Sequence, residues 1–160
     1  MPKQETVSLR KTLSELLRMK GAHLDLETAL VDFPAKLRGA KLPGAPHTAW
    51  QLLEHMRIAL WDIYEFSINQ KHQSPEWPKE YWPEKAAPEH EGDWDKSAKA
   101  YKDLIQQMSD LVSDEKVDLF ARIPHGDGQT ILREALLVAD HNAYHLGQLV
   151  LVRKLLGAWK

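Results

Sequence analysis

The chain has 160 residues, enough to bury a core, and we expect residues 1–160 to form a single domain. Lys and Arg number 21 and Asp and Glu 23, so the net charge of −2 supplies no electrostatic attraction to nucleic acid or to an anionic membrane. The absence of cysteine excludes disulfides, thiolate metal sites and cysteine nucleophiles.

The N-terminal part of the chain predicts one amphipathic helix and no targeting segment. Met1–Glu5 contains no signal-peptide core, and no apolar run of the chain reaches the length of a membrane span, so we expect a cytoplasmic protein. Leucines at helical spacing predict a first helix over residues 5–20, with Gly21 placed to end it. Residues 23–30 predict a short helical turn, and the glycines and prolines of 39–46 predict a loop.

A second helix has a well-defined start. Thr48 and Gln51 have the spacing of a capping box, and the helical pattern continues to about Ile68. Residues 70–92 follow, a proline-rich segment that is long for a loop inside a compact domain. Its tryptophans and tyrosine argue against disorder, so we expect this loop to lie on the surface of the bundle, in a position to cover one end.

Two further helices complete the chain. The third is predicted to begin at Asp93 as its cap and to run to about Val112, with apolar residues at near-ideal helical spacing. The fourth spans about 130–156, closes before Gly157, and is apolar on almost every side, so we expect it to be the most buried element. With no strand alternation and no internal repeat, the four patterns predict an all-α fold, a four-helix bundle.

Three histidines form the candidate site. His141 and His145 are one turn apart, so their imidazoles share a helix face with Cβ atoms about 6 Å apart. His55 lies in the middle of another helix and supplies a plausible third ligand. Three neutral imidazoles hold a divalent ion at about 2.0–2.1 Å and leave one coordination position open, which gives a Lewis acid site.

The alternative for the His141–His145 pair is two partly buried residues that bond to other protein groups. The apolar setting favours a metal, because burying imidazoles costs free energy unless something satisfies them. Three known metal or phosphate patterns are excluded. His141 is not followed by Glu as in zinc proteases, no Glu precedes a His by three residues as in di-iron bundles, and no phosphate loop is present.

Several other polar residues have two interpretations. Asp62 and Gln51 share roughly the face of His55 and could orient a ligand imidazole, although an exposed helix face explains them equally well. Asn142 and Tyr144 could line the cavity, with packing the better interpretation. His125 and Asp127 could reach the mouth of a site, but capping by Asp127 or Thr130 is simpler. The histidines without a partner at useful spacing, to which we assign no role, are His23, His47, His72 and His90.

Three segments carry a family resemblance. They are residues 50–55 with His55 inside a helix, the glycine-rich residues 123–130, and residues 140–149 with the His-x-x-x-His pair. Through them the chain closely resembles the DinB-like superfamily of metal-binding helical bundles. The resemblance implies up-down-down-up topology, a divalent ion, zinc or nickel, held by His55, His141 and His145, and a homodimer.

The same resemblance guides the functional hypotheses. Its members include transferases and isomerases that depend on bacillithiol, mycothiol or glutathione, so we expect a metal-dependent thiol S-transferase acting on a low-molecular-weight thiol and an electrophile. A non-catalytic metal-binding or stress-response module is the second hypothesis. A metal-dependent hydrolase is the third. None of these hypotheses involves nucleic acid or a membrane as partner.

Overall fold

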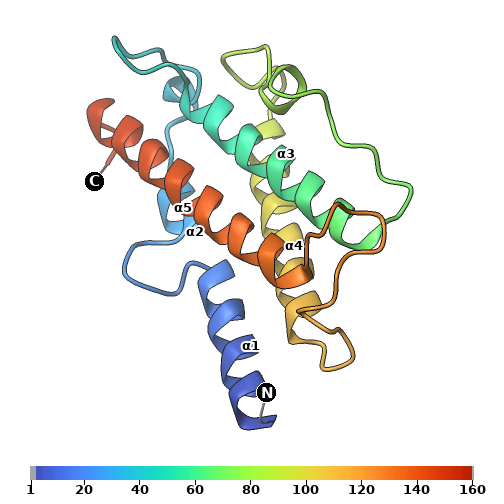
Figure 1. The fold of residues 1–160 in the computed structure, drawn as a ribbon. Helices are drawn as coiled ribbons and strands as arrows, with labels where there is room; N and C mark the ends of the chain where they lie inside the picture. The colour runs from blue at the N-terminus through green and yellow to red at the C-terminus, as the bar shows by residue number, and fades with distance from the viewer. Residues whose placement is uncertain (1–2, 160) are drawn as a thin grey trace.

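Four long helices make up most of the fold, and residues 3–159, which the computed structural model describes, contain no β-strand (Figure 1). The long helices are α1 (Lys3–Leu17), α3 (Ala49–Ile68), α4 (Asp93–Ser113) and α5 (Ile131–Leu155). The short ones are α2 (Leu26–Leu30) and the 3₁₀ turns η1 (Ala35–Leu37) and η2 (Lys79–Tyr81). Residues 1, 2 and 160 lie outside the described residues. They belong to the predicted domain, and residues 1 and 2 also belong to Met1–Glu5, where we expect no signal-peptide core.

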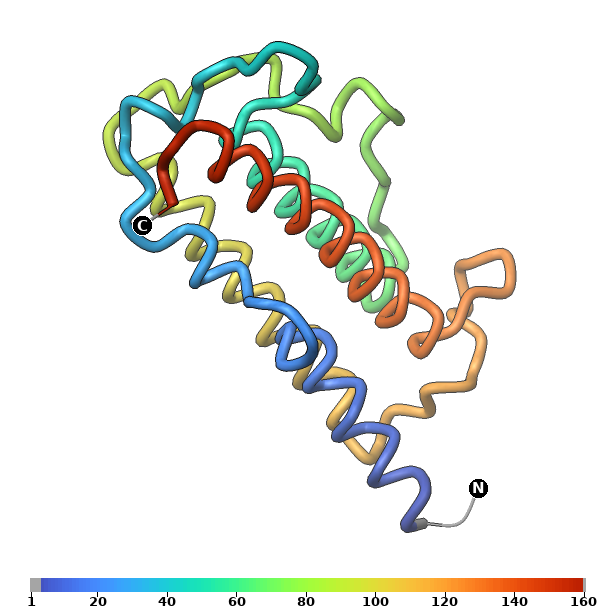
Figure 2. The backbone as a smooth tube through the Cα atoms, turned by 90° about the vertical axis from the view of Figure 1, so that its left-hand side faces the viewer, coloured from blue at the N-terminus to red at the C-terminus, as the bar shows by residue number. Residues whose placement is uncertain are grey.

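The helices form an up-down-down-up bundle, as predicted. In Figures 1 and 2, α1 and α5 run in one direction, and α3 and α4 run in the other. Helix α3 packs against α4 and α5, and α1 packs against the same two helices from the other side. None of the helices in the described part of the chain has both the length and the apolar character that a membrane span requires.

The topology explains the length of the proline-rich loop. Because α3 and α4 run in the same direction, the chain between them must return along the whole of α3, whose 20 residues extend about 30 Å. Figure 2 shows residues 69–92 running back beside α3 to the start of α4. The loop therefore covers one side of α3 and not only an end of the bundle.

Two of the predicted helix starts are confirmed and one is shifted. Thr48 and Gln51 form the capping box at the start of α3, and the Thr130 hydroxyl caps α5 by accepting from the backbone N–H of Arg133. The N-cap position of α4 is Gly92 and not Asp93, and no side chain caps this helix end. Gly92 has φ 87°, a conformation that only glycine tolerates easily. Asp93 instead accepts a hydrogen bond from the backbone N–H of His90 (2.8 Å).

The predicted end of the first helix is wrong. Helix α1 stops at Leu17, and Met19 in the left-handed conformation (φ 57°) ends it in place of Gly21. The backbone N–H groups of Met19 and Lys20 bond to the carbonyls of Leu16 and Glu15, which closes the helix in a Schellman arrangement. The Met19 side chain is buried in the core, and this burial offsets the strain of a left-handed non-glycine residue.

Helix α5 is less buried than predicted. One face packs on α3 and α1, but the opposite face leaves apolar side chains in solvent, namely Leu136, Tyr144, Leu151 and Leu155. A helix that is apolar on every side can pack only part of its surface in a four-helix bundle. Its predicted end before Gly157 is confirmed, since Gly157 has φ 66° directly after the last turn.

Candidate metal centre

His55 from α3 and the pair His141 and His145 from α5 meet between these two helices. The Nε2 atom of His55 lies 3.0 Å from Nε2 of His141 and 3.1 Å from Nε2 of His145. All three candidate ligand atoms lie within 4.8 Å of one another. His55 and His145 are buried, while His141 is partly exposed, so the cluster lies at the edge of the core and not at its centre.

The second ring nitrogen of two of these histidines has a fixed partner. His55 donates from Nδ1 to the backbone carbonyl of Tyr81 (2.9 Å), and His145 donates from Nδ1 to the side-chain oxygen of Gln148 (2.8 Å). Because the carbonyl of Tyr81 can only accept, the proton of neutral His55 must be on Nδ1. This leaves a lone pair on Nε2 of each ring, directed at the other histidines.

The surroundings keep these imidazoles neutral. Burial, with smaller contributions from the nearby His145 and His141, lowers the pKa of His55 to about 4. Burial also lowers the pKa of His141 to about 4, with His145 adding to the effect, and burial lowers the pKa of His145. At neutral pH the three imidazoles are therefore uncharged, and the unprotonated Nε2 atoms of His55 and His145 face each other across 3.1 Å.

This arrangement fits a metal ion. The facing lone pairs of His55 and His145 repel unless a cation lies between them, and the lowered pKa values of both rings disfavour a proton in that role. Nitrogen donors about 2.0–2.1 Å from one ion, at angles between octahedral and tetrahedral, are about 2.9–3.4 Å apart. The separations of 3.0 and 3.1 Å from His55 to the other two histidines fall in this range, and the three ligand atoms lie within 4.8 Å of one another. The residues present therefore match the ligands of a three-histidine centre, with two of the three spacings in the range of a bound ion.

The proline-rich loop forms one wall of the centre. Tyr81 supplies the carbonyl that binds His55, and the next residue, Trp82, stacks its indole on the His55 ring. Further along, the Thr48 hydroxyl donates to the carbonyl of Ala86 (2.6 Å) and Gln51 donates to the carbonyl of Pro83 (3.3 Å). The start of α3 thus holds the part of the loop that covers the His55 ring.

Of the two residues that we considered as partners for a ligand imidazole, neither contacts His55. Gln51 is used in the capping box and in its bond to the loop. Asp62 is buried and accepts hydrogen bonds from the Tyr81 hydroxyl (2.6 Å) and from Nε2 of His72 (2.8 Å). Its connection to His55 is therefore indirect, through Tyr81.

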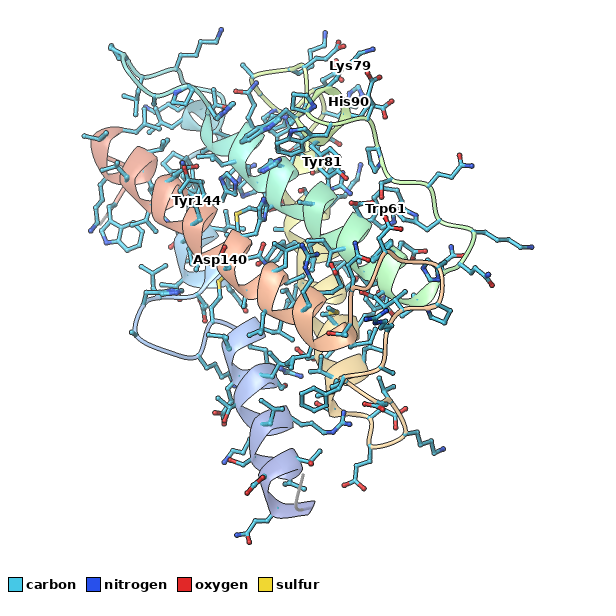
Figure 3. The ribbon with its side chains drawn as sticks, in the orientation of Figure 1. Trp61, Lys79, Tyr81, His90, Asp140 and Tyr144 are labelled. Carbon is cyan, nitrogen blue, oxygen red and sulfur yellow. The ribbon has the colours of Figure 1, made fainter. Side chains whose placement is uncertain are left out.

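Asn142 and Tyr144, which flank the histidine pair on α5, differ in burial. Asn142 is buried in the interior, in agreement with a packing role, although its side-chain oxygen and nitrogen have no hydrogen-bond partner. Tyr144 does not pack inside, since it is 65% exposed with its ring edge-on to His145 at 4.8 Å. Trp77 is 67% exposed and its ring lies 6.4 Å from that of His55. Figure 3 labels Tyr144 on α5 and Tyr81 in the loop beside α3.

The remaining histidines show where the sequence interpretation was incomplete. His125 donates from Nε2 to the carbonyl of Phe66 (2.7 Å) near the end of α3, about three turns from His55, so it does not reach the centre. His72 binds Asp62, and His47 stacks on Trp82 (3.7 Å, 11°). We had assigned no role to either. The only sequence signal for these contacts is the concentration of aromatic residues in a loop expected to be irregular.

Comparison with known proteins gives one family. The model of the DinB superfamily matches residues 12–149, which include all three histidines of the cluster. No curated protein matches the chain. No solved structure matches it either.

Proposed function

The chain belongs to the DinB superfamily, and on this premise we propose that it binds one divalent metal ion, zinc or nickel, through His55, His141 and His145 and activates a small-molecule thiol there. The convergence of the Nε2 atoms of three uncharged imidazoles is the observation that supports the proposal. A divalent ion at this position supplies Lewis acidity, which lowers the pKa of a thiol and favours its thiolate.

The chain itself contributes orientation and surroundings. Tyr81 and Gln148 hold the rings of His55 and His145 so that Nε2 of each faces the centre. The exposed rings of Trp77 and Tyr144 lie beside ligand histidines and offer apolar surface to an electrophile. With no cysteine in the chain, the thiol must come from outside.

The proposed reaction is a substitution at carbon. The S–H bond of the thiol breaks and its proton passes to solvent. An S–C bond forms with the electrophile while the bond to the leaving group breaks, and the leaving group departs with the electron pair. No oxidant or reductant is required.

The test is a conjugation assay. Protein loaded with zinc or nickel is incubated with bacillithiol, mycothiol or glutathione and a haloalkyl bimane, and fluorescence of the conjugate is followed. The matched control replaces His55, His141 and His145 by alanine. We expect metal-dependent conjugation above this variant with at least one thiol. If wild type and variant conjugate at equal rates with every physiological thiol, the proposal of thiol transfer is wrong. Metal binding is then measured separately.

A non-catalytic metal-binding module is the second candidate. It is favoured by the contact of His55 with the loop, since an ion held by His55 would also fix residues 81 and 82 on α3. In this case chelation would unfold the loop or the domain, and no thiol or hydrolytic activity would accompany the metal.

Metal-dependent hydrolysis is less well supported. A free carboxylate near the open coordination position would serve it as general base, and the two nearest candidates on α3 are both occupied. Both oxygens of Asp62 are bound by Tyr81 and His72, and both oxygens of Glu54 are bound by Arg57.

A further inference from the structure

Tyr81 is held on α3 at both of its polar ends. Its hydroxyl donates to Oδ2 of Asp62 (2.6 Å), and its backbone carbonyl accepts from Nδ1 of His55 (2.9 Å). Asp62 follows His55 by seven residues, which places the two side chains about two turns apart on one side of the helix. A single rigid helix therefore fixes both the side chain and the carbonyl of one loop residue.

Asp62 also holds the beginning of the loop. Its Oδ1 accepts from Nε2 of His72 (2.8 Å), so one carboxylate binds residues on both sides of the exposed segment that carries Trp77. The Asp62 side chain is 12% exposed, and burial of a carboxylate is costly unless it is hydrogen-bonded. The two bonds to Asp62 are accordingly expected to be formed nearly all the time.

The bond from Tyr81 has a fixed direction. Burial and the hydrogen bond to Asp62 raise the pKa of the Tyr81 hydroxyl, so it remains a donor throughout the physiological range. The carboxylate can only accept from it, and the phenol ring cannot turn away without leaving a buried oxygen unpaired.

We propose that Asp62 is a positioning residue of the metal centre, which acts through Tyr81 to hold the carbonyl that orients His55. Its carboxylate touches no ligand. It fixes the loop so that the Tyr81 carbonyl stays within reach of Nδ1, which keeps the proton on Nδ1 and directs the lone pair of Nε2 toward His141 and His145. The effect on metal affinity rests on the proposed function, whereas the effect on the His55 hydrogen bond does not.

Two variants separate this role from general stability. Asp62→Asn keeps the size of the side chain but replaces one acceptor oxygen by a donor. Tyr81→Phe removes only the hydroxyl and leaves the carbonyl that binds His55 in place. The matched controls are Asp140→Asn, which removes an exposed carboxylate next to His141, and Tyr64→Phe, which removes a hydroxyl from a tyrosine of α3 that does not contact Asp62.

The first measurement uses metal-free protein. The Nδ1–H proton of His55 is buried and hydrogen-bonded, so it should give a slowly exchanging imidazole resonance in ¹H–¹⁵N spectra of the wild type. We expect this resonance to broaden or disappear in Asp62→Asn and in Tyr81→Phe and to remain in both controls. The dispersed backbone spectrum of each variant shows whether it is folded.

The second measurement is zinc affinity by competition with a chelating dye. Loss of the partner of a ligand histidine lowers metal affinity by roughly 10–100-fold, and the indirect action of Asp62 should give about tenfold for Asp62→Asn and less for Tyr81→Phe. Wild-type resonance and affinity in both variants would overturn the proposal, as would an equal loss in Asp140→Asn, which would indicate charge alone. If the wild type binds no zinc, the proposed function fails and the resonance decides the role of Asp62.

Discussion

The indole of Trp82 lies parallel to the imidazole of His55, with ring centroids 3.7 Å apart and an interplanar angle of 4°. His47 stacks on the same indole at 3.7 Å and 11°. Two rings cannot occupy the same position over one face, so Trp82 lies between the two imidazoles. A loop residue thereby fixes the plane of the His55 ring, which the helix alone leaves free to rotate.

This stacking predicts that Trp82→Leu weakens metal binding. Aromatic pairs contribute about 0.5–1.5 kcal/mol beyond area burial, which corresponds to a loss of roughly two- to tenfold in zinc affinity. Isothermal titration of metal-free protein measures the change. Trp159→Leu is the control, because Trp159 stacks on Arg153 and Lys154 and not on a ligand. Unchanged affinity in Trp82→Leu would show that the stack does not orient His55.

The lowered histidine pKa values predict how the stability of metal-free protein depends on pH. The pKa of His55 and His141 falls from 6.5 to about 4 on folding, so the unfolded chain binds more protons between these values. The free energy of unfolding should therefore be highest above pH 6.5 and should fall as the pH drops toward 4. Urea denaturation at several pH values tests this prediction. The variant with alanine at all three histidines should show a shallower slope, and equal slopes would contradict the prediction.

Arg153 should be important for stability but not for metal binding. It is buried on α5 and donates to the carbonyls of Ala29 (2.7 Å) and Ala158 (2.9 Å), which ties α2 to the end of α5. Arg153→Leu leaves these carbonyls unpaired and should cost about 2–4 kcal/mol in the free energy of unfolding. Lys154→Leu, an exposed neighbour, is the control and should change it by less than about 0.5 kcal/mol. If both substitutions lower the free energy of unfolding by the same amount, the buried hydrogen bonds of Arg153 do not stabilise the fold.

Thr48 should contribute more to stability than an ordinary helix cap. Its hydroxyl accepts from the backbone N–H of Gln51 and also donates to the loop carbonyl of Ala86. Thr48→Ala should cost about 2 kcal/mol, the upper end of the range for a cap, and should increase hydrogen exchange in residues 82–88. Thr130→Ala removes a cap bond to Arg133 on α5 and should cost about 1 kcal/mol without affecting that loop. A larger loss from Thr130→Ala would be the contrary result.

Local patterns were sufficient for most of the fold. The capping box at Thr48 and the stop at Gly157 depend on residues a few positions apart, and the structure has them as predicted. Of the two caps that the sequence left open for α5, Asp127 and Thr130, the structure has Thr130. The shared face of His141 and His145 follows from helix geometry in the same way. Met19 escaped prediction because its left-handed conformation is stabilised by burial against distant residues, which no local pattern records.

The environment of His55 could not be predicted locally. Its Nδ1 partner is a backbone carbonyl, which every residue has, so the sequence gives no reason to select Tyr81. The roles of His72 and Asp62 depend on a loop that returns along α3 and brings residues ten positions apart together. The loop must return because α3 and α4 run in the same direction. That direction was predicted only from the resemblance to a family and not from local sequence patterns.

The metal content of untagged protein tests the central claim most directly. After incubation with zinc or nickel and gel filtration, elemental analysis should give about one ion per wild-type chain, and His55→Ala and His145→Ala should each lose most of it. His125→Ala, a histidine bonded to the far end of α3, should keep the wild-type value. Wild-type protein without bound metal, or the same content in His55→Ala as in wild type, would contradict the account.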